Sequence, residues 1–158
     1  MDLQLEINSV NTQRLGDTVL LWENGAGHGD EEIRKRGRLI GLGVFDCRAG
    51  TEAGSGACYI KFGGVLPGAN SAMYFDRLID ACETFARGRG MSRLVAGVNT
   101  GRYEAYRNLI SLGFRTEIQG VVMDSPNEPA YNKPGIYLID DWRQLILLNS
   151  RHRIEISP

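Results

Sequence analysis

The sequence has few residues of the kinds that build metal centres and nucleophilic triads. Its only histidines are His28 and His152, and its three cysteines are Cys47, Cys58 and Cys82. The cysteines show none of the paired spacings of zinc sites. With only two histidines, the chain has few candidates for a two-histidine metal site or for the histidine of a Ser–His–Asp triad. We therefore expect no metal.

The sequence also lacks a strong net charge and a long hydrophobic run. The formal net charge is −1, so no overall field attracts nucleic acid or a membrane surface. No apolar stretch is long enough to span a bilayer, and no signal peptide follows Met1. The odd cysteine count fits a reducing compartment. We expect a cytoplasmic protein with no nucleic-acid and no membrane partner.

What is present is the composition of one globular domain. The chain has 158 residues, of which 42% are hydrophobic. This is enough for the core of a single domain, which we expect to comprise residues 1–158. The 20 glycines cluster at 25–29, 41–43, 50–56 and 63–68, which indicates turns and strand ends.

Alternating and apolar patterns predict a mixed sheet with two main helices. Strands are expected at residues 3–10, 18–25, 38–46, 57–65, 93–98, 117–123 and 135–140. Helical spacing covers residues 71–87 and the stretch from Ala105 to Gly113, whereas residues 145–148 fit a strand or a helix. Strands 38–46 and 57–65 should pair as antiparallel neighbours, and 93–98 should be covered on both faces. This order predicts an α/β (α+β) fold, not a doubly wound nucleotide fold.

The segment 24–38 and the three cysteines are expected to have ordinary structural roles. Residues 24–38 are expected to form a loop, and the basic run IRKRGR within it is expected to be solvated, because no aromatic residues interleave it. Cys47 and Cys58 flank the turn at 48–56 and can lie across from each other, with two free thiols the expected state. Cys82 lies on the apolar helix face and is expected in the core.

Several local motifs are similar to those of one enzyme superfamily. They are VLP at the end of strand 57–65, RG closing the first helix, RLVAGVN, and the helix AYRNLISLGF with its closing Gly-Phe. Together with the element order, they resemble the GNAT N-acetyltransferase superfamily over residues 18–140. The resemblance implies a sheet in which the parallel strands 57–65 and 93–98 splay apart near Gly64.

In that superfamily acetyl-CoA lies in the splay, and its pantetheine arm pairs with the first strand. The resemblance thus implies that the cofactor contacts Gly64, Val65 and Leu66. Gly63 and Gly64 leave room for such an approach, although a β-bulge explains them equally well. Asn99, after the second strand, contacts the pantetheine arm in one reading and caps a helix in the other.

The turn VLPGANSAMYF lies where the superfamily has its pyrophosphate loop. The implied phosphate-binding residues, at the start of the helix, are Asn70, Ser71, Ala72 and Met73. The superfamily's two loop glycines are replaced here by Met73 and Phe75, whose side chains are expected to restrict the approach of a phosphate. Asn70 or Ser71 also suits a helix cap. This is a degenerate version of the loop.

The catalytic positions depart from the superfamily as well. Its usual tyrosine, four residues before the Gly-Phe, is Leu109 here, and Tyr106 lies one turn earlier. Tyr106 is a candidate acid, with a core tyrosine as the alternative. Tyr59 lies nearest to the superfamily's base position. Asp46, across the hairpin, is another candidate base, although a surface turn carboxylate is the plainer reading.

The N-terminus is short for this superfamily, which usually has a strand and two helices before the strand at 18–25. Only 16 residues precede Asp17, and the under-covered sheet implies a homodimer. Two functions follow. One is an acyl-CoA-dependent N-acyltransferase that moves acetyl from acetyl-CoA to an amine of a small molecule or peptide. The other is a catalytically inactive GNAT-fold module for binding or dimerisation.

Overall fold

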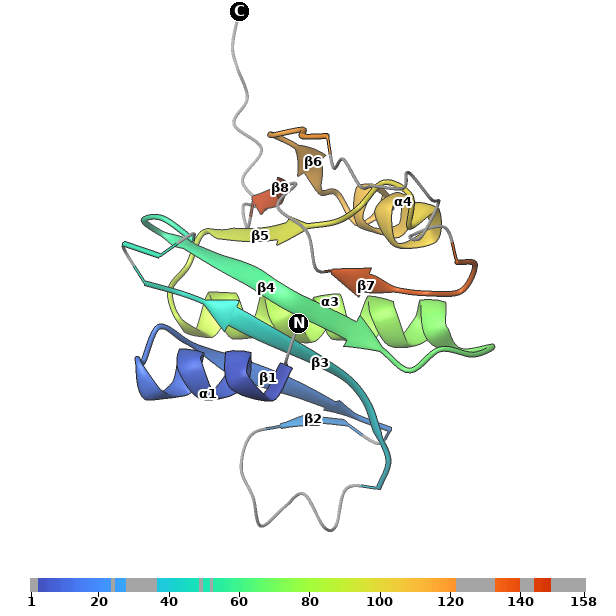
Figure 1. The fold of residues 1–158 in the computed structure, drawn as a ribbon, viewed down its shortest axis with the longest axis horizontal. Coiled ribbons are helices and arrows are strands. Elements are labelled where there is room, and N and C mark those ends of the chain that lie inside the picture. The colour runs from blue at the N-terminus through green and yellow to red at the C-terminus, as the bar shows by residue number, and fades with distance from the viewer. Residues whose placement is uncertain are drawn as a thin grey trace, which may run out of the picture.

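A computed structural model describes residues 3–23, 25–27, 37–48, 50–51, 53–121, 133–139 and 144–148 (Figure 1). In chain order its elements are α1 (Leu3–Thr12), β1 (Gly16–Trp22), β2 (Gly25–Gly27), β3 (Leu39–Asp46), β4 (Ala57–Val65), α3 (Ser71–Gly88), β5 (Arg93–Gly97), α4 (Tyr103–Ser111), β6 (Arg115–Thr116), β7 (Leu138–Ile139) and β8 (Gln144–Leu148).

The described strands form one mixed sheet in the order β2-β1-β3-β4-β5-β8-β6. Strand β7 lies outside this order and pairs with β4. Strands β3 and β4 are antiparallel, and β5 runs parallel to β4. Strand β8 is antiparallel to both β5 and β6. These pairings confirm the predicted fold class, the predicted β3–β4 hairpin and the parallel strand beside it. The ambiguous residues 145–148 lie in a strand.

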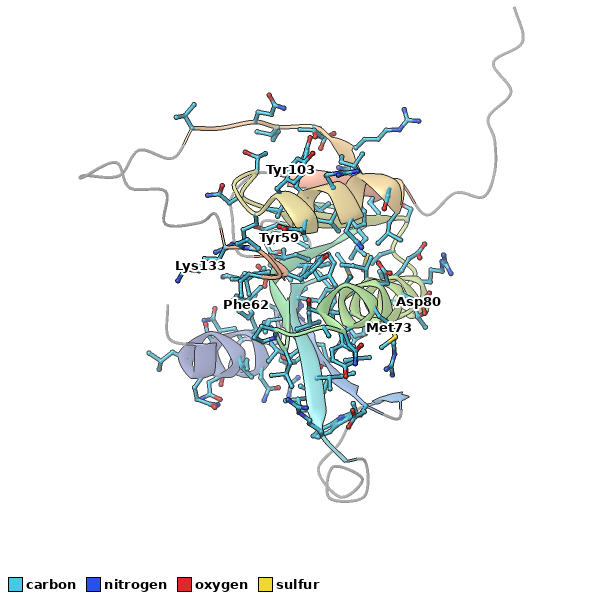
Figure 2. All side chains as sticks on the ribbon, turned by 90° about the vertical axis from the view of Figure 1, so that its right-hand side faces the viewer. Tyr59, Phe62, Met73, Asp80, Tyr103 and Lys133 are labelled. Carbon is cyan, nitrogen blue, oxygen red and sulfur yellow. The ribbon has the colours of Figure 1, made fainter. Side chains whose placement is uncertain are left out.

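Helices cover both faces of the sheet. Figure 2 shows α1 on one face and α3 on the other, with α4 above them. Helix α3 packs against β1, β3, β4 and β5, whereas α1 packs against β1 and β3. No helix among the described residues is long and apolar enough to cross a membrane.

Helix α3 buries one stripe of side chains that recur at helical spacing. They are Ser71, Phe75, Leu78, Ile79, Cys82 and Ala86. Each large apolar side chain in such a stripe contributes about 1.5–3 kcal/mol by leaving water. The helix ends before Gly90, whose φ of 71° is a left-handed conformation that glycine adopts without a steric cost. The predicted core face of this helix is therefore confirmed.

The prediction of a strand at residues 3–10 is wrong, because these residues form α1. Alternating Leu3, Leu5 and Ile7 suggested a strand with one apolar face. In the structure Leu5 is 66% exposed while Val10 is 2% exposed, so the buried side is set by helical and not by alternate spacing. One helix therefore precedes β1, whereas the sequence suggested none.

Two other boundaries differ from the prediction. Part of the expected loop at 24–38 forms β2, which pairs with β1, while most of the basic run at 33–38 lies outside the described residues. The strand expected at 117–123 is instead the short β6 at Arg115–Thr116. Residues 117–121 have no strand pairing, and the side chains of Ile118 and Val121 are exposed.

Candidate functional site

The two parallel strands at the centre of the sheet part before β4 ends. Their register runs from Ala57 opposite Arg93 to Ile60 opposite Ala96. Strand β4 continues to Val65 without β5 beside it. The predicted splay is therefore present, but it begins after Ile60 and not at Gly64. It leaves one edge of β4 available to another chain.

Strand β7 lies on that edge (Figure 1). It is antiparallel to β4, with Gly63 opposite Ile139 and Gly64 opposite Leu138. The N–H of Val65 donates to the carbonyl oxygen of Tyr137 at 3.4 Å. The backbone that the resemblance assigns to the pantetheine arm is thus already paired with the protein's own chain.

Side chains around β7 hold it in place. Ile139 is fully buried in the main core. The ring of Tyr137 packs against that of Phe75 in α3, with 5.2 Å between ring centroids and 46° between ring planes. Burial raises the pKa of Tyr137, and the nearby carboxylates of Glu104 and Asp76 raise it further. The Tyr137 hydroxyl therefore stays protonated at neutral pH and above.

The start of α3 lies just beyond the end of β4. Asn70 occupies the N-cap position without a side-chain capping bond, and the first turn holds no acidic residue. Ser71 is buried and its hydroxyl donates to the Gly68 carbonyl at 2.9 Å. The N–H groups of Ala72 and Met73 fall in the first turn, where helix geometry supplies no carbonyl partner. This end of the helix suits an anion.

Phe75 does not restrict that end of the helix, so the expectation for its side chain is wrong. Phe75 belongs to the buried stripe of α3 and is 0% exposed, because its position on the helix points it at the sheet. Met73 is 49% exposed at the first turn. Only one of the two bulky replacements therefore lies near the approach of a phosphate.

The candidates on the β5–α4 side are engaged in local structure. The Asn99 side-chain oxygen accepts a hydrogen bond from the Gly101 N–H at 2.9 Å, and its carbonyl accepts one from the Arg102 N–H at 2.8 Å. Asn99 therefore organises the turn into α4. Tyr106 is half-buried and packs against the core, while Leu109 is fully buried.

Tyr59 and Asp46 lie opposite each other in the β3–β4 hairpin. Tyr59 is 6% exposed and packs with Ala53, Ala57 and Val95. Asp46 is 3% exposed, so the reading of it as a surface turn carboxylate is wrong. It is the last residue of β3, and it pairs with Gly16, the first residue of β1.

A small apolar cavity of about 270 Å³ adjoins the end of β4, between Ile40, Phe62, Leu66 and Leu138. Cofactor sites usually measure about 300–1,000 Å³. With β7 in place, this cavity is too small and too apolar for a nucleotide. The described residues also contain no group of three potential metal ligands.

The sequence indicated a strand at 135–140 but gave no sign of its partner. Gly63 and Gly64 were the available signal, because two consecutive glycines in a strand mark a close approach by another chain. A Cβ built on Gly64 lies 2.7 Å from Cδ1 of Leu138. The residues that sequence reasoning missed are therefore Tyr137, Leu138 and Ile139.

Comparison with solved structures gives this arrangement a context. The chain is similar to an IAA acetyltransferase from Bacillus cereus ATCC 14579, with a TM-score of 0.56 and 19% identity, covering 94% of this chain and 85% of that one. It is also similar to yncA from Salmonella typhimurium, solved with its cofactor acetyl-CoA, with a TM-score of 0.51, 17% identity, and coverage of 96% and 76%. No protein-family model and no curated sequence matches the chain. The chain has the GNAT fold.

Proposed function

We propose that this protein is an acyl-CoA-dependent N-acyltransferase whose acyl-CoA site is closed by β7 until the nucleotide displaces it. The observation that carries the proposal is the splay between β4 and β5, which opens directly onto the start of α3. A sheet edge and a helix N-terminus in this relation suit a pantetheine amide chain followed by a pyrophosphate. The similar structure with acetyl-CoA supports the same assignment.

The fit of the described residues to acetyl-CoA differs between its two parts. The first turn of α3 fits a phosphate, because no side chain caps its N–H groups and no acidic residue lies in the turn to repel an anion. The β4 edge fits an amide chain only after β7 leaves Gly63 and Gly64. The bound molecule and β7 therefore compete for the same backbone groups.

For the chemistry, an amine acceptor must lose a proton and a thiolate must gain one. Tyr59 and Tyr106 remain the proposed residues for these roles. The acceptor is proposed to be an amine of a small molecule or peptide.

A second candidate function is a GNAT-fold module without catalysis. The specific observation in its favour is the closed β4 edge, where Val65, Gly64 and Gly63 already pair with residues 137–139. Leu109 at the superfamily's tyrosine position and Met73 at a glycine position agree with it. In this reading β7 is a permanent part of the sheet.

Calorimetric titration of acetyl-CoA distinguishes the two. The native protein is compared with a Tyr137→Ala/Leu138→Ala variant, in which β7 loses its ring contact and its side-chain contact with β4. We expect weak binding by the native protein and binding about tenfold tighter by the variant, which corresponds to about 1.4 kcal/mol of competing β7 stabilisation.

The control is Tyr103→Ala/Leu112→Ala, which removes two exposed side chains of the same kinds elsewhere and should bind like the native protein. Circular dichroism checks that each variant is folded. Absence of heat and of thermal shift at millimolar acetyl-CoA, in native protein and folded variant alike, would exclude the enzyme and leave the inactive module. Where binding is seen, release of the CoA thiol over a panel of amines tests transfer.

A further inference from the structure

At the end of β4 opposite to the splay, two cysteines lie in contact. Cys47 directly follows β3 and Cys58 is the second residue of β4. Because Asp46 is in register with Tyr59, the next residues along the hairpin face each other. The two sulfur atoms are 2.6 Å apart, and both residues are free thiols. The expectation that they lie across from each other is confirmed.

This placement suits the formation of a covalent bond between them. Directly opposed residues of antiparallel strands have Cβ atoms about 4.5–5.5 Å apart. A disulfide needs Cβ atoms about 3.5–4.5 Å apart, so only a small closure of the hairpin end is required. Cys58 is fully buried, whereas Cys47 is half-buried and reaches a surface pocket. A reagent from solvent therefore meets Cys47 first.

The pocket beside Cys47 is positively charged. It has a volume of about 260 Å³, and Arg14, Arg48 and Arg89 all line it. Arg89 pairs with Asp17 at 2.7 Å, but neither Arg14 nor Arg48 has a carboxylate partner among the residues that the structure describes. Two arginines without counter-charges favour a small anion next to the thiol.

The sulfur pair holds its protons unequally. The hydrogen bond between the two thiols raises the pKa of Cys47 and lowers that of Cys58. Burial opposes ionisation of both thiols, Arg89 favours it, and the buried Asp46 further raises the pKa of Cys47. The contact therefore favours a state in which one proton is shared between the two sulfur atoms.

We propose that Cys47 and Cys58 form a redox-active dithiol that reduces small carboxylate-bearing disulfides bound in the arginine-lined pocket. The site lies away from the splay, and the proposal does not depend on acyl transfer. Arg14 and Arg48 hold the carboxylates of the disulfide, Cys47 is the attacking sulfur, and Cys58 is the resolving one.

The exchange balances in two steps. With one proton shared between the two sulfur atoms, Cys47 attacks one sulfur of the disulfide RS–SR as the thiolate while Cys58 holds the proton, and RS⁻ leaves. The Cys58 thiol then gives that proton to a departing thiolate and attacks Cys47, which breaks the mixed disulfide and releases the second RS group. The sum is one thiol plus one thiolate and RS–SR giving the internal disulfide, RSH and RS⁻. The dithiol supplies both electrons.

The third cysteine provides an internal reference. Cys82 is fully buried in the main core, and its burial raises its pKa well above the ordinary range. It therefore stays a thiol while the protein is folded.

The test uses the whole native protein with two probes of similar size, anionic dithiodiglycolate and neutral bis(2-hydroxyethyl) disulfide. Free thiols are counted after denaturation, and the intact mass and a peptide map are recorded. We expect the loss of two thiols and two hydrogen atoms, a Cys47–Cys58 linked peptide, and an unmodified Cys82. Dithiodiglycolate should react faster than the neutral probe.

An Arg14→Gln/Arg48→Gln variant tests the pocket without touching the sulfur atoms. It should slow the reaction with dithiodiglycolate about tenfold, as expected for lost electrostatic attraction, and leave the neutral probe unchanged. Arg107→Gln, which removes an exposed arginine on α4, is the matched control and should change neither rate. Cys58→Ser should stop at a mixed disulfide on Cys47.

Three results would overturn the proposal. They are retention of all three thiols under excess of both probes, a stable mixed disulfide on Cys47 in the native protein, and a disulfide between two chains instead of within one. Equal slowing of both probes in the arginine variant would reject the anion site, because loss of charge affects only the anionic probe.

Discussion

Gly64 of β4 and Leu138 of β7 are direct partners across a sheet edge, and no side chain larger than hydrogen fits at Gly64 without displacing Leu138. The sequence offered two explanations for the glycines here, room for a pantetheine arm or a β-bulge. The structure adds a third, because the space belongs to the protein's own strand. A ligand for this edge must compete with an intramolecular partner.

Gly64→Ala should loosen β7 without unfolding the protein. The new Cβ lies 2.7 Å from Cδ1 of Leu138, at the end of a flexible side chain that has to move. We expect faster hydrogen exchange at the Val65 N–H, which donates to Tyr137. Gly64→Ala/Leu138→Ala should restore slow exchange, since the shortened side chain leaves the space. Unchanged exchange in the single variant would contradict the steric account.

Gly16→Ala should be among the most damaging single changes in the chain. A Cβ on Gly16 would lie 1.5 Å from the carbonyl oxygen of Phe45, a backbone atom that cannot move without separating β1 from β3. We expect a loss of more than about 3 kcal/mol in the free energy of unfolding, measured by urea denaturation.

Its control is Gly88→Ala at the end of α3, where the Cβ meets no atom within 4 Å. That change should be neutral or stabilise the protein by up to about 1 kcal/mol, because alanine is the better helix former. Equal effects of the two substitutions would show that β1 does not approach β3 as closely as described.

Phe75 and Met73 should behave oppositely, although the resemblance aligns both with loop glycines. Phe75→Ala removes a fully buried ring and should cost about 3–5 kcal/mol in unfolding free energy. Met73→Ala, at an exposed position, should change it by less than about 0.5 kcal/mol. Chemical denaturation of both variants checks this, and a severe effect of Met73→Ala would contradict the assigned rotation of α3.

Cys82 should make the protein less stable in alkali. Burial raises its pKa in the folded state above the ordinary value of 9.0. Its contribution is fully present below the pKa of the unfolded thiol and is lost as pH rises toward the folded pKa, because only the unfolded chain ionises. Between pH 7 and about pH 10, the native protein should lose up to about 1.4 kcal/mol more than Cys82→Ala. Parallel losses in urea titrations would contradict the burial.

The homodimer expected from an under-covered sheet face needs another surface, because α1 and α3 cover both faces of the sheet. We propose that it forms through the exposed apolar side chains of α4 and of the stretch that follows it. They are Ile110, Leu112, Ile118 and Val121, which are 41%, 40%, 52% and 88% exposed. Ile118→Lys/Val121→Lys should give a monomeric mass by light scattering, because charge disfavours burial of this surface. Leu5→Lys, on α1 at 66% exposure, is the control and should stay dimeric. A native monomer at micromolar concentration would contradict the expectation.

Much of the fold follows from local sequence patterns. Strands β3, β4 and β5 and helix α3 were predictable because each carries a long, consistent apolar pattern. Residues 3–10 were mistaken for a strand because Leu3, Leu5 and Ile7 alternate along the sequence. The exposure of Leu5 and the burial of Val10 identify the helix, and both depend on the packing of α1 against the sheet.

The position of the candidate site was predictable, but the pairing of its β4 edge with β7 was not. The splay and the start of α3 follow from the element order and the VLP turn. The pairing of β7 with β4 depends on contacts between residues more than seventy positions apart, which no local pattern encodes. Phe75 was assigned to the phosphate approach because the resemblance aligns it with a loop glycine, although its helical spacing with Leu78, Ile79 and Cys82 places it in the buried stripe of α3.

The position of β8 affects how the protein folds during its synthesis on the ribosome. This strand leaves the exit tunnel after every other described strand, yet it lies inside the sheet and joins β5 to β6. Until it emerges, the nascent chain carries β5 with one open edge and β6 with nothing to bind. Those unpaired edges are what a chaperone would recognise, and a chain stalled before Gln144 should depend on one.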